Sequence, residues 1–223
     1  MIQKTRYDSV AVRLYGALID PLLWVLRPRI VRLCCGLGAA TVLDIASATG
    51  AQCRMLGRAG IQTTGIDLAE SMVAAARRRG GRNTHYIHGS ACSLPFDAGS
   101  FDASLLLLAL HEHEEEERKI MLAEALRVLR PAGHLIIADY TRPPHTVLHA
   151  PWHVIRFIEE IAGSGHRAGF KDFIARGGLA GLLDRHHLAP VAQSGSHFST
   201  IGIAVIREVA KTLNDIGNPF GSK

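Results

Sequence analysis

From Thr41 to Tyr140 the sequence alternates short apolar runs with helical patterns, and this alternation constrains the fold more than any other feature. The apolar runs are continuous, which is typical of strands buried on both faces. Strand–helix alternation of this kind predicts a parallel sheet covered by helices on both faces. The expected strands are Val42–Ile45, Gln62–Ile66, His85–His88, Ala103–Ala109 and His134–Asp139. The expected helices are Ala51–Arg58, Ala69–Arg79 and Glu114–Leu129, the last ended by Pro131 and Gly133.

Two more apolar runs near the end of the chain, Val191–Ser194 and Ile201–Ile206, are joined by a connection too short for a crossover helix. Parallel neighbours need such a crossover, so at least one of these strands must be antiparallel. The sequence therefore predicts an α/β fold with a Rossmann-like, doubly wound sheet of seven strands. The sheet is expected to be mostly parallel, with an antiparallel C-terminal strand.

A chain of 223 residues fits one domain. The pattern over Tyr7–Leu33 indicates one or two helices, interrupted at Pro28 because proline removes a backbone donor and clashes inside a helix. Helical patterns before and after the core predict lids over the open end of the sheet. The expected regions are an N-terminal helical lid (1–40), the cofactor-binding core (41–140), a helical insertion or lid (141–188), a strand pair (189–207) and a tail (208–223).

Composition narrows the class of protein. A hydrophobic content of 48% with 20% charged residues is typical of globular domains. The four cysteines form no CxxC pair, which disfavours a zinc knuckle. No secretory signal is visible and the apolar runs are too short to span a bilayer, so we expect a soluble, cytoplasmic protein. Two arginine clusters fit solvated helix faces, and also leave open phosphate binding or peripheral contact with an anionic membrane: Arg27, Arg29 and Arg32, and Arg77, Arg78, Arg79 and Arg82.

The run TVLDIASATG, Thr41–Gly50, predicts a buried strand that ends in a tight turn. In open parallel sheets, ligands bind beyond the carboxyl ends of the strands, beside the first strand. A dinucleotide would require the spacing G-x-G-x-x-G, and the corresponding positions here are Ala46, Ala48 and Ala51. A nucleotide-dependent oxidoreductase is therefore disfavoured.

The same turn fits a second pattern, D-x-G-x-G-x-G, with Asp44 as the leading acid and Gly50 as the last glycine. Four motifs follow in order: GIDLAESM at 65–72, GSACSLPFDAGSFD at 89–102, ALHEH at 109–113 and RVLRPAG at 127–133. On these motifs, Tyr7–Tyr140 resembles the class I S-adenosylmethionine-dependent methyltransferases. Within that class it is most similar to the branch of ubiquinone and menaquinone C-methyltransferases (methyltransferase type 11).

The resemblance implies that S-adenosylmethionine is the cofactor and S-adenosylhomocysteine the product. Asp67, about twenty residues beyond the turn, would accept hydrogen bonds from the ribose hydroxyls. Tyr7 and Tyr15 match tyrosines of a recurrent N-terminal run, where one would cover the cofactor; alternatively, either packs on the core. The cofactor-binding residues expected on this basis are Tyr7, Tyr15, Asp44, Ala46, Ser47, Ala48, Gly50, Asp67, Leu68, Met72, Ser90, Ala91 and Leu108.

Three residues depart from the family pattern. Ala46 and Ala48 stand where glycine is usual, and their Cβ atoms cost energy if either residue needs a positive φ. If neither does, alanine stiffens the turn. Ser90 replaces an acid that accepts from the adenine amino group, and a hydroxyl accepts more weakly. These departures leave a second hypothesis open: a catalytically degenerate module that serves binding or regulation.

His111 is the candidate catalytic residue, because it follows the fourth strand and an imidazole suits a general base near neutral pH. The alternative is a histidine that only lines the pocket. His111 and His113 could share a face and ligate a metal, but no third ligand has a convincing spacing. The glutamates at 114–117 are explained by the positive end of a helix. No metal is expected.

The methyl acceptor is expected to be a small, hydrophobic molecule, such as a quinone-like ring or a lipid. The apolar residues of the two lids indicate this, although most of them also fit simple packing on the sheet. A histidine, two aromatics and basic groups at 165–173 fall on a helix expected to enter the pocket. The chain lacks an Asn-Pro-Pro-Tyr-type motif after the fourth strand, so no nucleic-acid partner is expected. The sequence assigns no oligomeric state. The apolar lid residues on which the expectation of a hydrophobic acceptor rests are Leu22, Leu23, Trp24, Leu26, Trp152, Ile155, Phe157 and Ile158.

Overall fold

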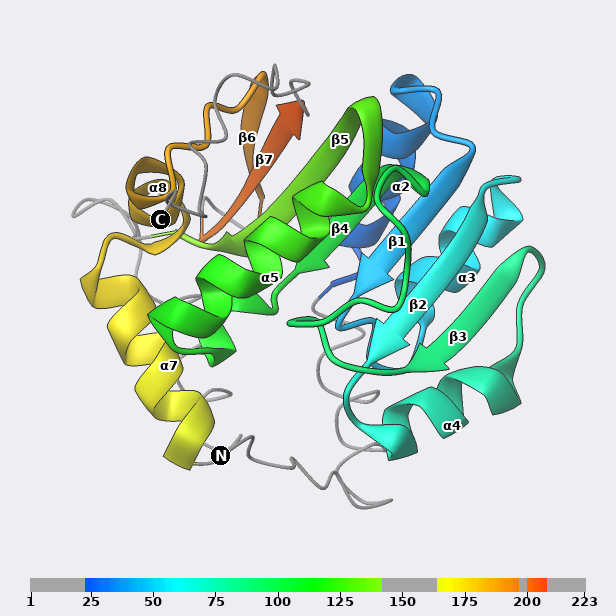
Figure 1. The fold of residues 1–223 in the computed structure, drawn as a ribbon, viewed down its shortest axis with the longest axis horizontal. Coiled ribbons are helices and arrows are strands. Elements are labelled where there is room, and N and C mark those ends of the chain that lie inside the picture. Colours follow the sequence, from blue (N-terminus) through cyan, green and yellow to red (C-terminus); the bar gives the residue numbers. More distant parts are fainter. Residues whose placement is uncertain (1–22, 142–163, 197–199, 208–223) are drawn as a thin grey trace, which may run out of the picture.

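The computed structural model describes residues 23–141, 164–196 and 200–207, and it contains the predicted seven-stranded sheet (Figure 1). The strand order is β3-β2-β1-β4-β5-β7-β6. The strands are β1 (Thr41–Ile45), β2 (Gln62–Asp67), β3 (Thr84–His88), β4 (Phe101–Leu107), β5 (Leu129–Tyr140), β6 (Ala192–Ser196) and β7 (Ile201–Arg207). The helices are α2 (Leu26–Gly36), α3 (Ala51–Arg58), α4 (Glu70–Arg79), the 3₁₀ turn η1 (Leu110–Glu112), α5 (Glu115–Arg127), α7 (Ser164–Ala175) and α8 (Gly178–Arg185).

Strands β1 to β5 are all parallel, and β7 is antiparallel to both β5 and β6. The predicted antiparallel strand near the C-terminus is thus β7, which inserts between β5 and β6. The order of the strands reverses between β1 and β4, because β2 lies on one side of β1 and β4 on the other. This switch point places the carboxyl ends of β1, β2 and β4 beside one another, at the edge where open α/β sheets bind ligands.

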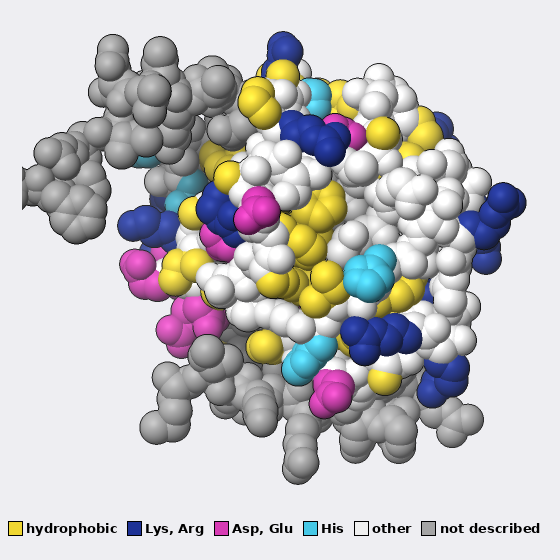
Figure 2. All heavy atoms as spheres, turned by 45° about the vertical axis from the view of Figure 1, so that its right-hand side comes forward, with side chains coloured by type: hydrophobic (Ala, Val, Ile, Leu, Met, Phe, Trp, Pro, Cys, Tyr) yellow, Lys and Arg dark blue, Asp and Glu magenta, His cyan; other side chains and the backbone are white. Residues whose placement is uncertain are grey.

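Helices cover both faces of the sheet. Helix α3 packs on the face where Asp44 points, since the Cys53 thiol of α3 lies 3.2 Å from Oδ2 of Asp44. Helix α5 packs on the opposite face, where the Ser104 hydroxyl donates to the carbonyl of Ala125. Between β3 and β4 the chain forms a loop at 89–100 that runs in front of the sheet (Figure 1). The face turned forward in Figure 2 shows hydrophobic side chains near its centre and several basic side chains toward its rim.

Two prolines lie in different settings from those predicted. Pro28 does not interrupt a helix but is the third residue of α2, in the first turn, where backbone N–H groups have no intrahelical acceptor and proline is tolerated. Pro131 does not end α5, which stops at Arg127. Leu129 already pairs with Phe101 in the sheet, and a register shift beyond that pair accommodates Pro131 within β5.

No helix in the described ranges combines the length and the apolar character that crossing a bilayer requires.

Candidate active site

The turn from Ala46 to Gly50 connects β1 to α3 at the carboxyl edge of the sheet, and three backbone N–H groups of the turn donate hydrogen bonds. The N–H of Ser47 donates to the carbonyl of Ile66 on β2 at 3.0 Å, and the N–H of Gly50 donates to the carbonyl of Ser47 at 2.9 Å. The N–H of Ala48 donates to Oδ2 of Asp67 at 2.7 Å. The turn is therefore anchored to the end of the neighbouring strand.

Three residues of this turn adopt the left-handed region of backbone conformation: Ala46 with φ 58°, Ala48 with φ 47° and Gly50 with φ 73°. A Cβ atom raises the energy of this conformation, typically by about 1–2 kcal/mol per residue. The two alanines therefore do occupy positions that favour glycine, and the strain considered from the sequence is present. Strained backbone of this kind is concentrated at functional sites.

Gly50 could not be replaced by alanine as the usual glycines at positions 46 and 48 are. A Cβ atom at this position would lie 2.4 Å from a ring carbon of Tyr86. Tyr86 is itself buried, and its hydroxyl donates to the carbonyl of Gly50 at 3.3 Å. Both the positive φ and the close approach of the tyrosine therefore explain why glycine is retained here and not at positions 46 and 48.

Asp67 ends β2 and uses both of its carboxylate oxygens to hold backbone. Oδ2 accepts from Ala48, and Oδ1 accepts from the N–H of Ala69 at 2.8 Å, in the approach to α4. Burial raises the pKa of this carboxyl, and the two backbone hydrogen bonds oppose that rise. Each carboxylate oxygen has a second lone pair, so Asp67 retains acceptor capacity for a ligand.

Asp44 lies beneath the turn and is almost fully buried. Burial raises the pKa of its carboxyl from 3.8 to about 7, although the hydrogen bond from Cys53 and the charge of Arg27 lower it. Burial likewise raises the pKa of the Cys53 thiol, which therefore remains a proton donor to Oδ2 of Asp44. A titratable carboxyl thus lies directly under the predicted cofactor turn.

Two polar side-chain atoms next to the turn are buried and have no hydrogen-bond partner within the described parts of the chain. They are the hydroxyl oxygen of Thr49 and the amide oxygen of Gln52. The amide nitrogen of Gln52 does have a partner, the carbonyl of Arg27 in α2. Because buried polar atoms are normally hydrogen-bonded, these two oxygens are exceptions beside the turn.

The remaining predicted cofactor residues lie around the same edge, apart from Tyr7 and Tyr15, which fall outside the described residues. The Ser90 hydroxyl accepts from the N–H of Cys92 at 3.1 Å, which shapes the loop after β3. Leu108 has φ 52° and donates its N–H to the carbonyl of Ala138 at 2.7 Å. Leu68 is exposed and Ala91 packs against the core, whereas Met72 is buried in a cluster against which Ala48 packs.

His111 lies in η1, four residues beyond the end of β4, and is buried at 2% exposure. Its Nδ1 is 2.8 Å from Oδ1 of Asp139, which is fully buried near the end of β5. Asp139 also accepts from the N–H groups of Leu110, His111 and Tyr140. Because a carboxylate only accepts, Nδ1 of His111 carries the proton in this contact, while Nε2 lies 4.0 Å from Oε1 of Glu112.

Aromatic rings surround the imidazole of His111. The ring centroids of Tyr140, Phe170 and Phe173 lie 4.6, 6.1 and 6.4 Å from it. Phe170 and Phe173 come from α7, the helix that contains the predicted 165–173 segment. Sequence reasoning missed Asp139, whose only signal was a carboxylate at the end of the fifth strand.

His113 has a different environment from His111, because its Nδ1 is 3.0 Å from Oε2 of Glu117 in α5. Among the described residues, no group of three histidine, cysteine, aspartate or glutamate side chains is placed to hold a metal ion.

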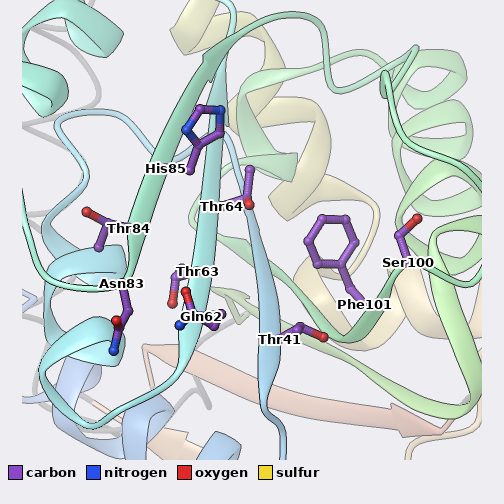
Figure 3. Close-up of a pocket in the computed structure, with 9 residues that line it drawn as sticks. All are labelled: Thr41, Gln62, Thr63, Thr64, Asn83, Thr84, His85, Ser100 and Phe101. Atoms are coloured by element: carbon purple, nitrogen blue, oxygen red, sulfur yellow. The ribbon is translucent and has the colours of Figure 1, made fainter.

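A hollow lies at the other end of the sheet (Figure 3). It has a volume of about 290 Å³ and is lined at the amino ends of β1 to β4 by Thr41, Gln62, Thr63, Thr64, Asn83, Thr84, His85, Ser100 and Phe101. Because it lies away from the turn after β1 and from Asp67, it is not the predicted cofactor site.

The strand order, with its antiparallel β7 and its turn anchored by an acid on β2, defines a Rossmann-like fold of the class I methyltransferase type. The family model for a methyltransferase domain matches residues 43–137. A solved structure of the N-methyltransferase NodS from Bradyrhizobium japonicum, in complex with S-adenosylhomocysteine, superimposes with a TM-score of 0.60. It is 17% identical and covers 82% of this chain and 85% of its own, which shows the shared fold.

Curated relatives include two demethylmenaquinone methyltransferases. The protein from Clavibacter sepedonicus is 35% identical over 105 residues, which cover 46% of this chain and 42% of the relative. The protein from Thermus thermophilus is 33% identical over 145 residues, or 62% of this chain and 63% of the relative. The matches thus span less than two thirds of these relatives. Residues 43–137 thus match the methyltransferase-domain family, and they lie within a sheet whose topology is the Rossmann-like one of the solved methyltransferase structure.

Proposed function

We propose that this chain transfers a methyl group from S-adenosylmethionine to a hydroquinone-like acceptor, with His111 as general base. The observation that carries the proposal is the buried pair of His111, just after β4, and Asp139, near the end of β5, at the same edge as the cofactor turn. The names of the relatives support a quinone-type acceptor, since two are demethylmenaquinone methyltransferases.

The residues at this edge fit the cofactor. Asp67 has lone pairs left for the ribose hydroxyls, and Thr49 and Gln52 offer buried acceptor oxygens that need donors. Ser90 offers a hydroxyl on the loop where the adenine is expected. When bound, S-adenosylmethionine supplies an electrophilic methyl group on a sulfonium, whose departure as a sulfide needs no proton. General-base help is therefore needed on the acceptor side alone.

His111 would supply that help. Its Nε2 would take the proton from a hydroxyl of the hydroquinone, which makes the ring a stronger nucleophile at the carbon beside it. Once that carbon has taken the methyl group, the hydrogen it carried would leave as a proton and the ring oxygen would be protonated again, so that one proton is released overall. Asp139 holds Nδ1–H and so fixes the tautomer that leaves Nε2 unprotonated. The aromatic rings of Tyr140, Phe170 and Phe173 keep this region apolar, which favours a flat aromatic acceptor over a charged one.

The proposal is tested by incubating the full chain with methyl-labelled S-adenosylmethionine and demethylmenaquinone reduced by dithionite. We expect label in the quinone fraction and a mass increase of one methylene unit, with little product from His111→Ala. Absence of product with tight binding of S-adenosylhomocysteine would refute this acceptor but not the methyltransferase activity.

The second hypothesis is a degenerate binding module, favoured by the positive φ of Ala46 and Ala48. Calorimetry with S-adenosylhomocysteine separates the two hypotheses. A module that has lost the cofactor would give no heat, whereas the proposed enzyme would bind its product. Binding without turnover of any quinol, phenol or amine acceptor would favour the module.

A further inference from the structure

Arg118 of α5 is a fully buried arginine outside the predicted site. Its guanidinium donates to four different groups. Nε donates to the carbonyl of Leu110 at 2.9 Å and Nη2 to the carbonyl of Gly169 at 3.0 Å. Nη1 donates to Oε2 of Glu115 at 3.0 Å and to Oδ2 of Asp172 at 2.8 Å. A buried charge is tolerated only when paired in this way, so these contacts are needed together.

The partners of Arg118 belong to two segments that are far apart in the sequence. Leu110 immediately precedes His111 in η1, and Gly169 and Asp172 lie on α7. The guanidinium carbon also lies 5.1 Å from the ring centroid of Phe173, on the same helix. One side chain thus joins the turn that carries the proposed base to the helix that supplies its aromatic surroundings.

Gly169 allows the two segments to meet. A Cβ atom at this position would lie 2.7 Å from the carbonyl oxygen of Glu112 and 2.8 Å from that of His111. Both atoms are backbone, so the contact cannot be relieved by rotating a side chain. The next residue, Phe170, meets the imidazole of His111 edge-on. Only glycine lets α7 approach η1 this closely.

Outer ion pairs extend the connection to α8. The second oxygen of Glu115 accepts from Nε of Arg185 at 3.0 Å, and Oδ1 of Asp172 accepts from Nε of Arg176 at 2.6 Å. Arg185 also donates to the carbonyl of Arg176, which ties α8 back to the end of α7. Helices α7 and α8 are therefore joined to the start of α5 through buried and half-buried charges.

We propose that Arg118 is a positioning residue, which together with Gly169 locks α7 to the η1 turn so that α7 forms a fixed wall of the acceptor site rather than a lid that swings away. This inference rests on the proposed function of His111 as base. Arg118 acts through the Leu110 carbonyl on the placement of His111 and through α7 on the placement of Phe170 and Phe173. It does not contact the acceptor itself.

Gly169→Ala tests the lock without changing any charge. The methyl group must push α7 away from η1, so we expect hydrogen exchange of the α7 amides to accelerate at least tenfold, with α3 and α4 unchanged. The ¹⁵N signals of the His111 imidazole should shift as its surroundings change. Turnover of reduced demethylmenaquinone should fall about 10- to 100-fold in kcat, as expected when a reacting group is displaced by about 1 Å. The Kd for S-adenosylhomocysteine should stay within twofold.

The matched control is Gly36→Ala at the end of α2, where an added Cβ meets no atom within 4 Å. It should leave every one of these measurements unchanged. Wild-type exchange in α7 and an unshifted His111 signal in Gly169→Ala would overturn the proposal. If the wild-type chain shows no turnover, the proposed function fails, but the exchange and imidazole measurements still decide whether the lock exists.

A second pair of variants covers the case in which Gly169→Ala does not fold. Asp172→Asn removes the charge that faces Arg118 and should produce the same changes at smaller size, about three- to tenfold in kcat. Arg176→Gln removes only the outer partner of Asp172 and should change neither the α7 exchange rates nor kcat. Equal effects of the two substitutions would overturn the role of Arg118, because they would assign the docking of α7 to the outer pair.

Discussion

The backbone N–H of Ala48 donates a 2.7 Å hydrogen bond to Oδ2 of Asp67, so one carboxylate both anchors the strained turn after β1 and faces the expected ribose site. This hydrogen bond from the end of β2 helps to hold the backbone of Ala46 and Ala48 in its strained conformation. Removing the acid should disturb the shape of the turn and the recognition of the cofactor at once.

Asp67→Asn should therefore raise the Kd for S-adenosylhomocysteine by about 10- to 100-fold, since charge-assisted hydrogen bonds are roughly twice as strong as neutral ones. The amide would also turn an NH₂ group toward one of two backbone donors, Ala48 or Ala69. Calorimetry measures the affinity. Glu70→Gln, an exposed acid three residues along the chain, is the matched control and should bind like the wild type.

Ala46→Gly and Ala48→Gly should each stabilise the fold, because glycine adopts a positive φ without the steric cost of a Cβ. We expect the free energy of unfolding to rise by about 0.5–1 kcal/mol for each variant, after allowing for the greater freedom of glycine in the unfolded chain. Urea denaturation gives the value. Ala74→Gly, on the exposed side of α4, makes the same exchange inside a helix and should lower the free energy of unfolding.

Stability should also depend on pH through Asp44. Burial raises the pKa of this carboxyl to about 7 in the folded chain, whereas the unfolded chain releases the proton near 3.8. Between these values the folded state binds more protons than the unfolded state, so the contribution of Asp44 to stability falls as pH rises from about 4 to 7. Over this pH range, the contribution of Asp44 to the free energy of unfolding should fall by on the order of 4 kcal/mol.

The measurement is the difference between wild type and Asp44→Asn, because acids whose pKa is lowered, such as Asp102 and Glu115, give the opposite slope and cancel in the difference. The asparagine variant should gain relative stability steadily up to pH 7 and no further above it. A difference that does not change with pH would show that Asp44 titrates normally. Asp97→Asn, at an exposed position, is the control.

Much of the fold could be predicted because its signals are local. The continuous apolar runs predict β1 to β4 to within two residues at either end, whereas β5 begins at Leu129 and not at His134. The short connection before Ile201 requires an antiparallel strand. The helix breaks predicted at Pro28 and Pro131 are wrong because proline is compatible with a first helical turn and with an irregular strand. Only the hydrogen-bonding pattern distinguishes these settings from a helix break.

The site was only partly predictable, for a related reason. Asp67 ends β2 and His111 lies four residues beyond the end of β4, so the edge on which they lie follows from topology. Asp139 meets His111 across 28 residues of sequence, and Arg118 meets Gly169 across 51. Arg118 follows four glutamates and so resembles the solvated face of a helix, yet it is fully buried. Such pairings depend on tertiary packing, which a single sequence does not display.

Asp139→Asn gives a last and separate test of the proposed base. An asparagine whose oxygen stands in place of Oδ2 can keep accepting from the N–H groups of Leu110 and His111. Its NH₂ group would then stand in place of Oδ1, lose the N–H of Tyr140 and favour the His111 tautomer with the proton on Nε2. The ring would then present a donor where the acceptor hydroxyl needs a base. We expect kcat for reduced demethylmenaquinone to fall by about 10²- to 10⁴-fold, the usual contribution of general-base catalysis. Affinity for S-adenosylhomocysteine should change little. A variant that retains wild-type turnover, with ¹⁵N spectra showing the inverted tautomer, would remove His111 from the mechanism.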